Sequence, residues 1–165
     1  ELGARGMSLS LDPGSYRGNI TMNYKDEELV LGTPICFEAT VPSVTRSLVR
    51  QGEVSTDLLV NLSNDGWFGS VDGGRLQHAL AARYRCIEWR QPMLRVANTG
   101  QTAWYDSCGR QVSALPPRTA GTLLATPRGD GRRTLYGMIG NTIPIICLIT
   151  LVLAFVSGFR REQDS

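Results

Sequence analysis

Residues 27–63 read EELVLGTPICFEATVPSVTRSLVRQGEVSTDLLVNLS, and this stretch decides the fold. It contains two short apolar runs, Glu28 to Ile35 and Asp57 to Ser63, which have the length and continuous apolarity of buried strands. Between the runs, Pro42 suits the first turn of a helix and Gly52 ends it. Two strands joined by a helix predict a βαβ unit with a parallel pair, and therefore an α/β fold.

Helix and strand signals continue after this unit. A loop, NDGWFGS, precedes a helix from about Arg75 to Arg90, in which apolar residues recur at spacings of three and four. This spacing predicts a buried helix face made of Leu76, Ala79, Leu80, Arg83 and Ile87. The further elements expected are a strand at 92–98, two strands around a turn at 107–109, and a last strand, GTLLATP, at 121–127.

Length, charge and cysteine content exclude several classes of protein. The 165 residues suffice for one domain with a hydrophobic core, and the net charge of +2 is spread along the chain, so we expect no nucleic-acid partner. None of the four cysteines has a C-x-x-C spacing, which disfavours structural zinc. They also lie in different kinds of segment, which disfavours a disulfide framework. We expect neither a metal nor a cofactor.

The two ends of the chain differ from the middle. Residues 1–19 are rich in Gly, Ser and Pro, without the regions of a signal peptide, and they predict a loop in a chain that begins inside a longer protein. After a polar linker at 128–135, residues 143–159 carry no charge, which predicts a transmembrane helix over 136–159 rather than a buried C-terminal helix. Arginines open the tail, 160–165, and place it in the cytoplasm, with the domain on the opposite side.

The first candidate site residue is Cys36, at the end of the first apolar run. A cysteine attacks as its thiolate, and the carboxyl end of a parallel strand offers open space and a following helix N-terminus whose dipole favours the anion. The backbone N–H of Phe37 would point to the same space and help to hold an oxyanion. The alternative is an ordinary buried cysteine, because free cysteine is among the most buried residue types.

The stretch NLSNDGWFG, residues 61–69, follows the second apolar run and should open on the same edge of the sheet. Asn64 and Asp65 can bond to the backbone and fix the loop. Trp67 and Phe68 would give the site an apolar wall. The alternative is a turn whose two aromatic residues pack in the core.

Together these stretches resemble the C-terminal half of apolipoprotein N-acyltransferase, a membrane enzyme family of the nitrilase, or carbon–nitrogen hydrolase, superfamily. The resemblance runs from about Gly14 to Arg161. The family's Cys-Tyr-Glu is Cys-Phe-Glu here, at residues 36–38, and its Arg-Pro is Gln91-Pro92. The other matched positions are Ser63, Asn64, Asp65, Trp67, Phe68, Gly69, Gln77, His78, Asn98 and Gly100. We expect His78, the only histidine, to cap or pack rather than to act in catalysis.

The resemblance implies acyl transfer in two steps. The acyl chain of a phospholipid passes to Cys36 as a thioester, and then to the free α-amino group of a diacylated lipoprotein. Glu38 is implied as a support for the site and Trp67 as an aromatic residue near the acyl chain. The residues expected to line the substrate pocket are Asn64, Asp65, Trp67 and Phe68. The implied location is the bacterial inner membrane, with the catalytic part on the periplasmic side.

Two groups of the family's site have no counterpart in this sequence. The family's Glu base and oxyanion-stabilising Lys lie upstream of the cysteine, and the only lysine here, Lys25, lies among acidic residues and is expected in a charged turn. Two alternatives therefore stay open, a soluble nitrilase-type amidase and a catalytically inactive membrane-anchored module, and we expect the chain alone to be inactive. The expected fold is α/β, with half of a nitrilase-type α-β-β-α sandwich at residues 20–127, followed by the transmembrane helix.

Overall fold

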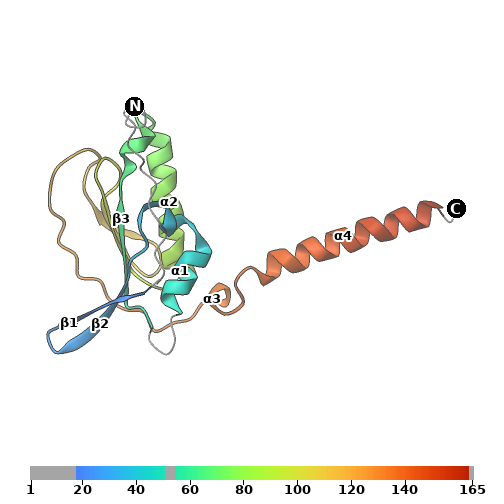
Figure 1. Ribbon diagram of the computed structural model, residues 1–165, viewed down its shortest axis with the longest axis horizontal. Helices are drawn as coiled ribbons and strands as arrows, with labels where there is room; N and C mark the ends of the chain where they lie inside the picture. Colours follow the sequence, from blue (N-terminus) through green and yellow to red (C-terminus); the bar gives the residue numbers. More distant parts are fainter. Residues whose placement is uncertain (1–17, 51–54, 164–165) are drawn as a thin grey trace, which may run out of the picture.

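The computed structural model describes residues 18–50 and 55–163, and the side chains of the last helix as far as Ser157. Six strands form one mixed sheet in which neighbours in the chain are also neighbours in the sheet. Two helices lie on one side of this sheet, and a long helix projects away from it (Figure 1). The strands are β1 (Ile20–Tyr24), β2 (Glu27–Gly32), β3 (Leu58–Ser63), β4 (Met93–Ala97), β5 (Ala103–Tyr105) and β6 (Gln111–Ala114).

The βαβ unit predicted from residues 27–63 is confirmed. β2 and β3 are parallel, and α1 (Pro42–Val49) connects them with Pro42 in its first turn. β4 is also parallel to β3, whereas β1, β5 and β6 pair antiparallel with their neighbours. The carboxyl ends of β2, β3 and β4 therefore meet at one edge, where open α/β sheets place their sites. One helical layer on one sheet makes up half of a four-layer α-β-β-α sandwich, and this half is what the sequence analysis expects.

The second helix, α2 (Asp72–Trp89), begins three residues earlier than expected and buries a different face. Leu76, Leu80 and Ile87 of the predicted face are exposed. The buried residues of α2 are Arg75, His78, Ala79, Ala82, Arg85, Cys86 and Trp89. Of the predicted face only Ala79 is buried, and the rest was wrong because each buried polar residue of this set has an acidic partner, which offsets the cost of its burial.

A small apolar core fixes α2 against the sheet. Its fully or almost fully buried members are Ala39, Leu59, Ala82, Cys86, Met93, Ala103 and Tyr105. Small side chains on α2 allow the helix to lie close to β3 and β4, since interiors pack without voids. The ends of α2 are therefore placed firmly relative to the ends of these strands.

Two parts of the sheet differ from expectation. β1, which the sequence analysis left unassigned, forms a hairpin with β2 through Lys25 and Asp26, whose φ angles of 51° and 65° are those of a tight two-residue hairpin turn. Lys25 is thus in a charged turn, as expected. The strand predicted at 121–127 is absent from the described structure. The chain leaves the sheet after β6, and Leu124 is 91% exposed, so no neighbouring strand supports this segment.

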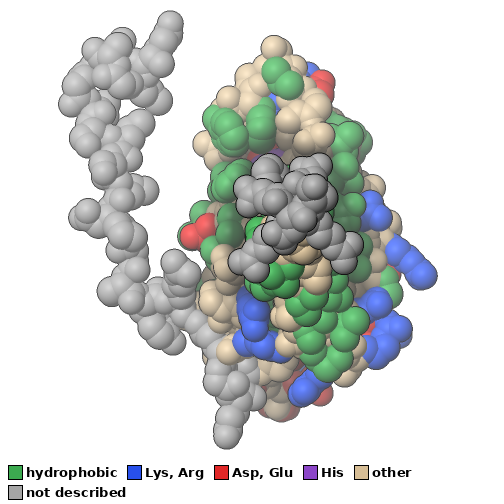
Figure 2. Space-filling view, turned by 90° about the vertical axis from the view of Figure 1, so that its right-hand side faces the viewer, with side chains coloured by type: hydrophobic (Ala, Val, Ile, Leu, Met, Phe, Trp, Pro, Cys, Tyr) green, Lys and Arg blue, Asp and Glu red, His purple; other side chains and the backbone are tan. Residues whose placement is uncertain are grey.

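The apolar C-terminal stretch is helical but interrupted. α3 (Leu135–Ile139) ends at Gly140, whose φ of 58° lies in the left-handed region, and α4 (Thr142–Gln163) follows. The unbroken helix predicted over 136–159 was therefore wrong, because Gly140 turns the chain. Within residues 18–50 and 55–163, no helix combines the length and the apolarity needed to cross a membrane. Figure 2 shows the face of the molecule from which α4 projects. Hydrophobic side chains are gathered on this face.

Candidate active site

Cys36 lies where the chain leaves the carboxyl edge of the sheet. β2 ends at Gly32, Ile35 makes one parallel bridge with Leu62, and Cys36 opens the short 3-10 helix η2 (Cys36–Thr40). The φ of Cys36 is 48°, a left-handed conformation that is uncommon for a residue with a side chain. Residues held in this way cluster at functional sites. The thiol is half-buried, so it is reachable from solvent.

The backbone on both sides of Cys36 is held by side chains. The amide nitrogen of Asn61 donates to the carbonyl oxygens of Pro34, at 2.8 Å, and of Cys36, at 3.3 Å. The carboxylate of Glu38 accepts from the backbone N–H of Ile35 at 2.8 Å. Glu38 therefore turns back onto the loop, and its part as a support for the site stays a prediction.

Ser63, at the end of β3, joins the thiol to a buried carboxylate. Its Oγ lies 3.5 Å from Cys36 Sγ and 2.7 Å from Asp65 Oδ1. A hydroxyl has one proton and two lone pairs. Ser63 can therefore donate to Asp65 while it accepts from the thiol, or donate to the thiolate instead. The same hydroxyl serves both protonation states of the sulfur.

Asp65 is the centre of a buried charged cluster. Its carboxylate accepts from Arg95 Nη2 at 3.0 and 3.2 Å and from His78 Nδ1 at 2.9 Å, while Arg95 Nη1 donates to Asn61 Oδ1. Asp65 is fully buried and Arg95 is 1% exposed. Burial alone would raise the pKa of Asp65, but the hydrogen bond from Ser63, the charge of Arg95 and the contact with His78 hold that pKa below its ordinary value.

The loop after β3 is fixed by two asparagines and packed against a glycine. Asn64 Oδ1 accepts from the backbone N–H of Gly66 at 3.1 Å and from Asn98 Nδ2 at 2.7 Å, and Asn98 Oδ1 accepts from the backbone N–H of Asp65 at 2.9 Å. A Cβ atom at Gly100 would lie 1.8 Å from Asp65 Oδ2. Asn64 therefore bonds to the backbone of this loop, and its place in a substrate pocket stays a prediction. The Asp65 side chain points inward and does not line the surface.

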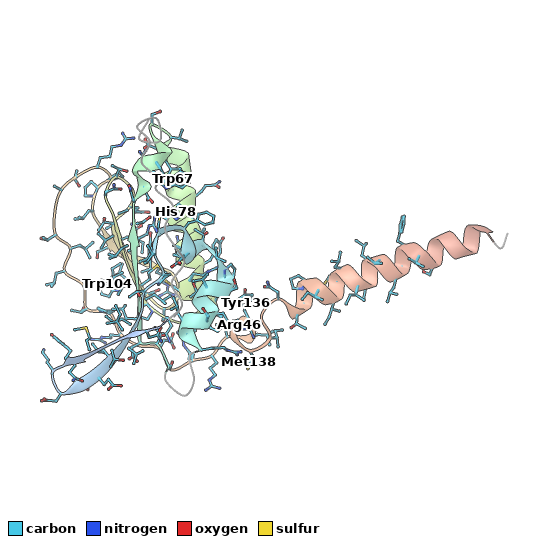
Figure 3. The ribbon with its side chains drawn as sticks, viewed as in Figure 1. Arg46, Trp67, His78, Trp104, Tyr136 and Met138 are labelled. Carbon is cyan, nitrogen blue, oxygen red and sulfur yellow. The ribbon has the colours of Figure 1, made fainter. Side chains whose placement is uncertain are left out.

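Aromatic rings form a continuous wall beside this edge. Trp67 stacks on Phe68 with ring centroids 4.0 Å apart, and His78 lies 5.7 Å from the ring of Phe68 and 6.1 Å from that of Phe37. Trp67 and His78 lie at the same end of α2 (Figure 3). Trp67 is 63% exposed and Phe37 60%, so neither packs in the core. The backbone N–H of Phe37 belongs to the first turn of η2, where such groups lack partners within the helix.

The other cysteines lie in different surroundings. Cys86 is buried within α2, where burial raises the pKa of its thiol to about 12. Cys147 is exposed on α4, and Cys108 lies in the turn between β5 and β6 with Arg90 Nη1 3.1 Å from its sulfur. In the part of the chain that the structure describes, no group of His, Cys, Asp and Glu side chains is arranged to hold a metal.

Arg95 is the site residue that the sequence analysis missed. It stands in the middle of the apolar strand MLRVA, and arginine is almost never fully buried without a partner. That isolated cation was the signal for an acidic group inside the fold. His78 packs, as expected, but it also bonds directly to Asp65.

A family model described as carbon-nitrogen hydrolase matches residues 13–132. The chain belongs to the carbon-nitrogen hydrolase family. The apolipoprotein N-acyltransferase of Chlorobaculum tepidum is 39% identical to this carbon-nitrogen hydrolase chain over 129 residues, which are 78% of the chain and 24% of that protein. Apolipoprotein N-acyltransferase 1 of Treponema denticola is 35% identical over 125 residues, 74% and 22% of the two lengths. These relatives confirm the resemblance seen in the motifs.

This carbon-nitrogen hydrolase chain spans about a quarter of the length of the curated relatives that it matches. Among solved structures, a carbon-nitrogen hydrolase from Helicobacter pylori G27 is similar at a TM-score of 0.49 and 12% identity, over 55% of this chain and 38% of the other.

Proposed function

We propose that this chain is the nucleophile-bearing part of an apolipoprotein N-acyltransferase. One observation carries the proposal: a reachable thiol on a left-handed residue lies at the sheet edge, in the same region as an exposed aromatic wall. Ile35 and Leu62 are also 65% and 58% exposed. Large apolar side chains gathered on a surface mark binding sites, and a fatty acyl chain has the matching chemistry. The names of the relatives support the same activity.

In the first proposed step, Cys36 Sγ attacks the ester carbonyl of a phospholipid. A C–S bond forms and the ester C–O bond breaks, and the thiol proton ends on the alcohol oxygen of the departing lysophospholipid. In the second step, the α-amino group of a diacylated lipoprotein attacks the thioester. A C–N bond forms, the C–S bond breaks, and one amine proton returns to sulfur.

The surrounding residues have separate parts in this proposal. Ser63 donates to the thiolate and then turns to Asp65 when the sulfur is protonated. The N–H of Phe37 faces the oxyanion that develops on the ester carbonyl. Glu38 and Asn61 hold the backbone of the thiol loop, and Trp67 contacts the acyl chain.

Helix α4 brings this site to its lipid substrate. Its apolar side chains from Ile143 to Val156 are between 45% and 69% exposed. A helix that is apolar all round requires apolar surroundings. In the proposal, α4 contacts the apolar interior of a bacterial membrane.

Thioester trapping tests the proposed function. The matching residues of this chain replace their counterparts in the Chlorobaculum tepidum relative, and membranes are incubated with a phospholipid that carries an alkyne-tagged acyl chain. We expect a hydroxylamine-sensitive label that Cys36→Ala removes and Cys108→Ala leaves. Label that survives Cys36→Ala, or a folded chimera that takes up none, would contradict the proposal.

Flotation with phosphatidylcholine vesicles tests the membrane contact. The chain should float with the vesicles, and Leu148→Glu together with Leu153→Glu should leave it at the bottom of the gradient, because both side chains are exposed on α4. Leu124→Glu is the control, since Leu124 is also an exposed leucine, at 91% against 61% and 62% for Leu148 and Leu153, but lies outside α4. Equal loss of flotation in the control would contradict a specific part for α4.

A further inference from the structure

A cavity lies at the end of α2 that is far from the thiol. Its volume is about 600 Å³, within the range of small-molecule sites, and it lies between the C-terminal end of α2, the linker after β6 and α3. Along α2, Trp89 in the cavity wall is roughly 16 Å from His78, at 1.5 Å per residue. Figure 3 shows the two ends, with Trp67 and His78 at one and Tyr136 and Met138 at the other. The cavity is therefore separate from the thiol site.

The charges around this cavity do not balance. Its wall holds three arginines, Arg50, Arg132 and Arg133, and two carboxylates. Both carboxylates already have partners, because Asp130 accepts from Arg132 at 2.7 Å and Glu88 accepts from Arg85 at 2.7 Å, outside the wall. Among the residues that the structure describes, Arg50 and Arg133 have no carboxylate partner.

Burial also acts on the Glu88 carboxyl group of the wall. It raises the pKa of Glu88, and the charge of Arg85 offsets this only in part. Within residues 18–50 and 55–163, the guanidinium groups of Arg50 and Arg133 thus line the cavity without an ion-pair partner. A guanidinium is a planar fork of donors that matches the oxygens of a phosphate or a carboxylate.

The cavity wall also contains a donor that lacks an acceptor. Trp89 is only 8% exposed, and its indole Nε1 has no hydrogen-bond partner within the described part of the chain. Nε1 is itself shielded from solvent, so it is no contact for a ligand in the cavity, and the arginines of the wall carry the recognition. Arg50 is held over the same ring, 5.7 Å from its centroid, and donates to the carbonyl of Gly137.

The position of the cavity indicates where a ligand for these arginines comes from. Met138 and Gly137 of α3 line it, and the apolar helix α4 begins at Thr142, shortly after α3. Figure 2 shows Lys and Arg side chains on the face from which α4 projects. If α4 contacts lipid, the cavity lies at the depth of the headgroups. We propose that this cavity binds the phosphate of an anionic phospholipid headgroup, at a site distinct from the acyl-donor site at Cys36.

The test is the binding of short-chain phosphatidylglycerol to the 165-residue chain in neutral-detergent micelles, followed by titration calorimetry. Arg50→Gln and Arg133→Gln should each weaken binding about tenfold, the usual size of one lost charge-assisted hydrogen bond. Arg133→Lys keeps the charge but loses the planar guanidinium donors. Its affinity for phosphatidylglycerol should lie between the affinities of these variants and of the unchanged chain. The matched control is Arg46→Gln, expected to change binding less than about twofold. Arg46 lies beside Gly140 at the root of α4, but outside the cavity wall.

Two further arms separate the possible sources of binding. The losses in Arg50→Gln and Arg133→Gln should be the same in a Cys36→Ala background as in the unchanged chain, so this result stands whether or not Cys36 transfers acyl chains. Inorganic phosphate should compete only weakly, because it lacks the glycerol and acyl contacts.

Several results would overturn the proposal. Absence of binding by the unchanged chain would do so, as would an equal loss in Arg46→Gln, which would indicate general surface charge. A loss in Trp67→Ala as large as in Arg133→Gln would place the lipid at the thiol site. Inorganic phosphate that binds as tightly as the lipid, with the same dependence on Arg133, would make the ligand a soluble phosphate.

Discussion

The charged residues near the two ends of α2 differ in their burial and in their pairing. At the end near the thiol, Asp65, Arg95 and His78 are buried and bond to one another. At the other end, Arg50 and Arg133 are exposed at a cavity and form no ion pair with a carboxylate among the described residues. Buried charges must be paired inside the protein and therefore fix a geometry. Exposed charges without partners remain available to a ligand, so one end positions the thiol and the other end can bind an anion.

The largest expected loss of stability comes from removing one partner of the buried Asp65–Arg95 ion pair. Asp65→Ala leaves the guanidinium of Arg95 buried without its carboxylate, and removal of one partner of a buried pair costs about 3–5 kcal/mol of the free energy of unfolding. Urea unfolding measures this loss. Arg118→Ala is the control, because its ion pair with Asp72 is exposed and such pairs contribute less than about 1 kcal/mol. Similar losses in the two variants would contradict the distinction between buried, paired charges and exposed ones.

A smaller loss of the free energy of unfolding is expected at Gly100, which packs against the carboxylate of Asp65. In Gly100→Ala, the new methyl would lie 1.8 Å from Asp65 Oδ2 and force the buried cluster to move. Overpacking of this kind costs about 1–3 kcal/mol of the free energy of unfolding. Gly73→Ala should have the opposite sign and stabilise by up to about 1 kcal/mol, since it lies in α2 with open space around it. Thermal unfolding of both variants measures these changes in stability. Destabilisation by Gly73→Ala without destabilisation by Gly100→Ala would contradict both expectations.

Removal of the Ser63 hydroxyl, which joins the thiol to the buried cluster, should have a more modest effect, on the alkylation rate of Cys36. Ser63→Ala removes a donor to the Cys36 thiolate, and a hydrogen bond of about 1 kcal/mol corresponds to a roughly fivefold slower alkylation by iodoacetamide near pH 7. Mass spectrometry of the labelled peptides follows each cysteine separately. Cys108 in the same protein is the internal control, and its rate should not change. Cys86 should stay unlabelled in the folded chain, because burial raises the pKa of its thiol to about 12.

The smallest effect is the pH dependence that one carboxyl contributes. The pKa of Asp65 in the folded chain is held below its ordinary value of 3.8, so in acid the unfolded chain takes up a proton before the folded chain does. The stability from this group is present above about pH 5 and is lost as the pH falls through the folded-state pKa. Urea midpoints of the unchanged chain and of Asp65→Asn, compared from about pH 6 to pH 3, should converge as the pH falls. Parallel curves would show that Asp65 does not titrate in this way.

The sequence predicted the parts of this fold that depend on local pattern. The parallel pair β2 and β3, the connecting helix and the thiol at the sheet edge follow from two apolar runs and Pro42. β1 was not predicted because its five residues are all exposed, so no burial pattern marks them. The run at 121–127 has strand composition, but a strand needs a neighbour, and the sheet ends at β6.

The buried face of α2 and the Asp65 cluster depend on contacts between distant residues. Asp65 and Arg95 are thirty residues apart in the sequence, and the parallel pairing of β3 with β4 brings them together. Without that pairing, Arg75, His78 and Arg85 count as surface residues, and periodicity assigns the wrong face to the helix. A lone arginine in an apolar strand was the one local sign of the cluster.

The order of strands in the sheet has a consequence for how the chain folds during synthesis. Each strand pairs with the strand made just before it, from β1 through β6. A strand leaving the ribosome therefore meets an edge that has already formed, and the sheet grows in the order of translation. The antiparallel pairs β1–β2, β4–β5 and β5–β6 are local in sequence, which favours fast folding, whereas the parallel pairs β2–β3 and β3–β4 must each close a helical crossover first. An exposed hydrophobic strand edge during synthesis is thus covered as soon as the next strand emerges.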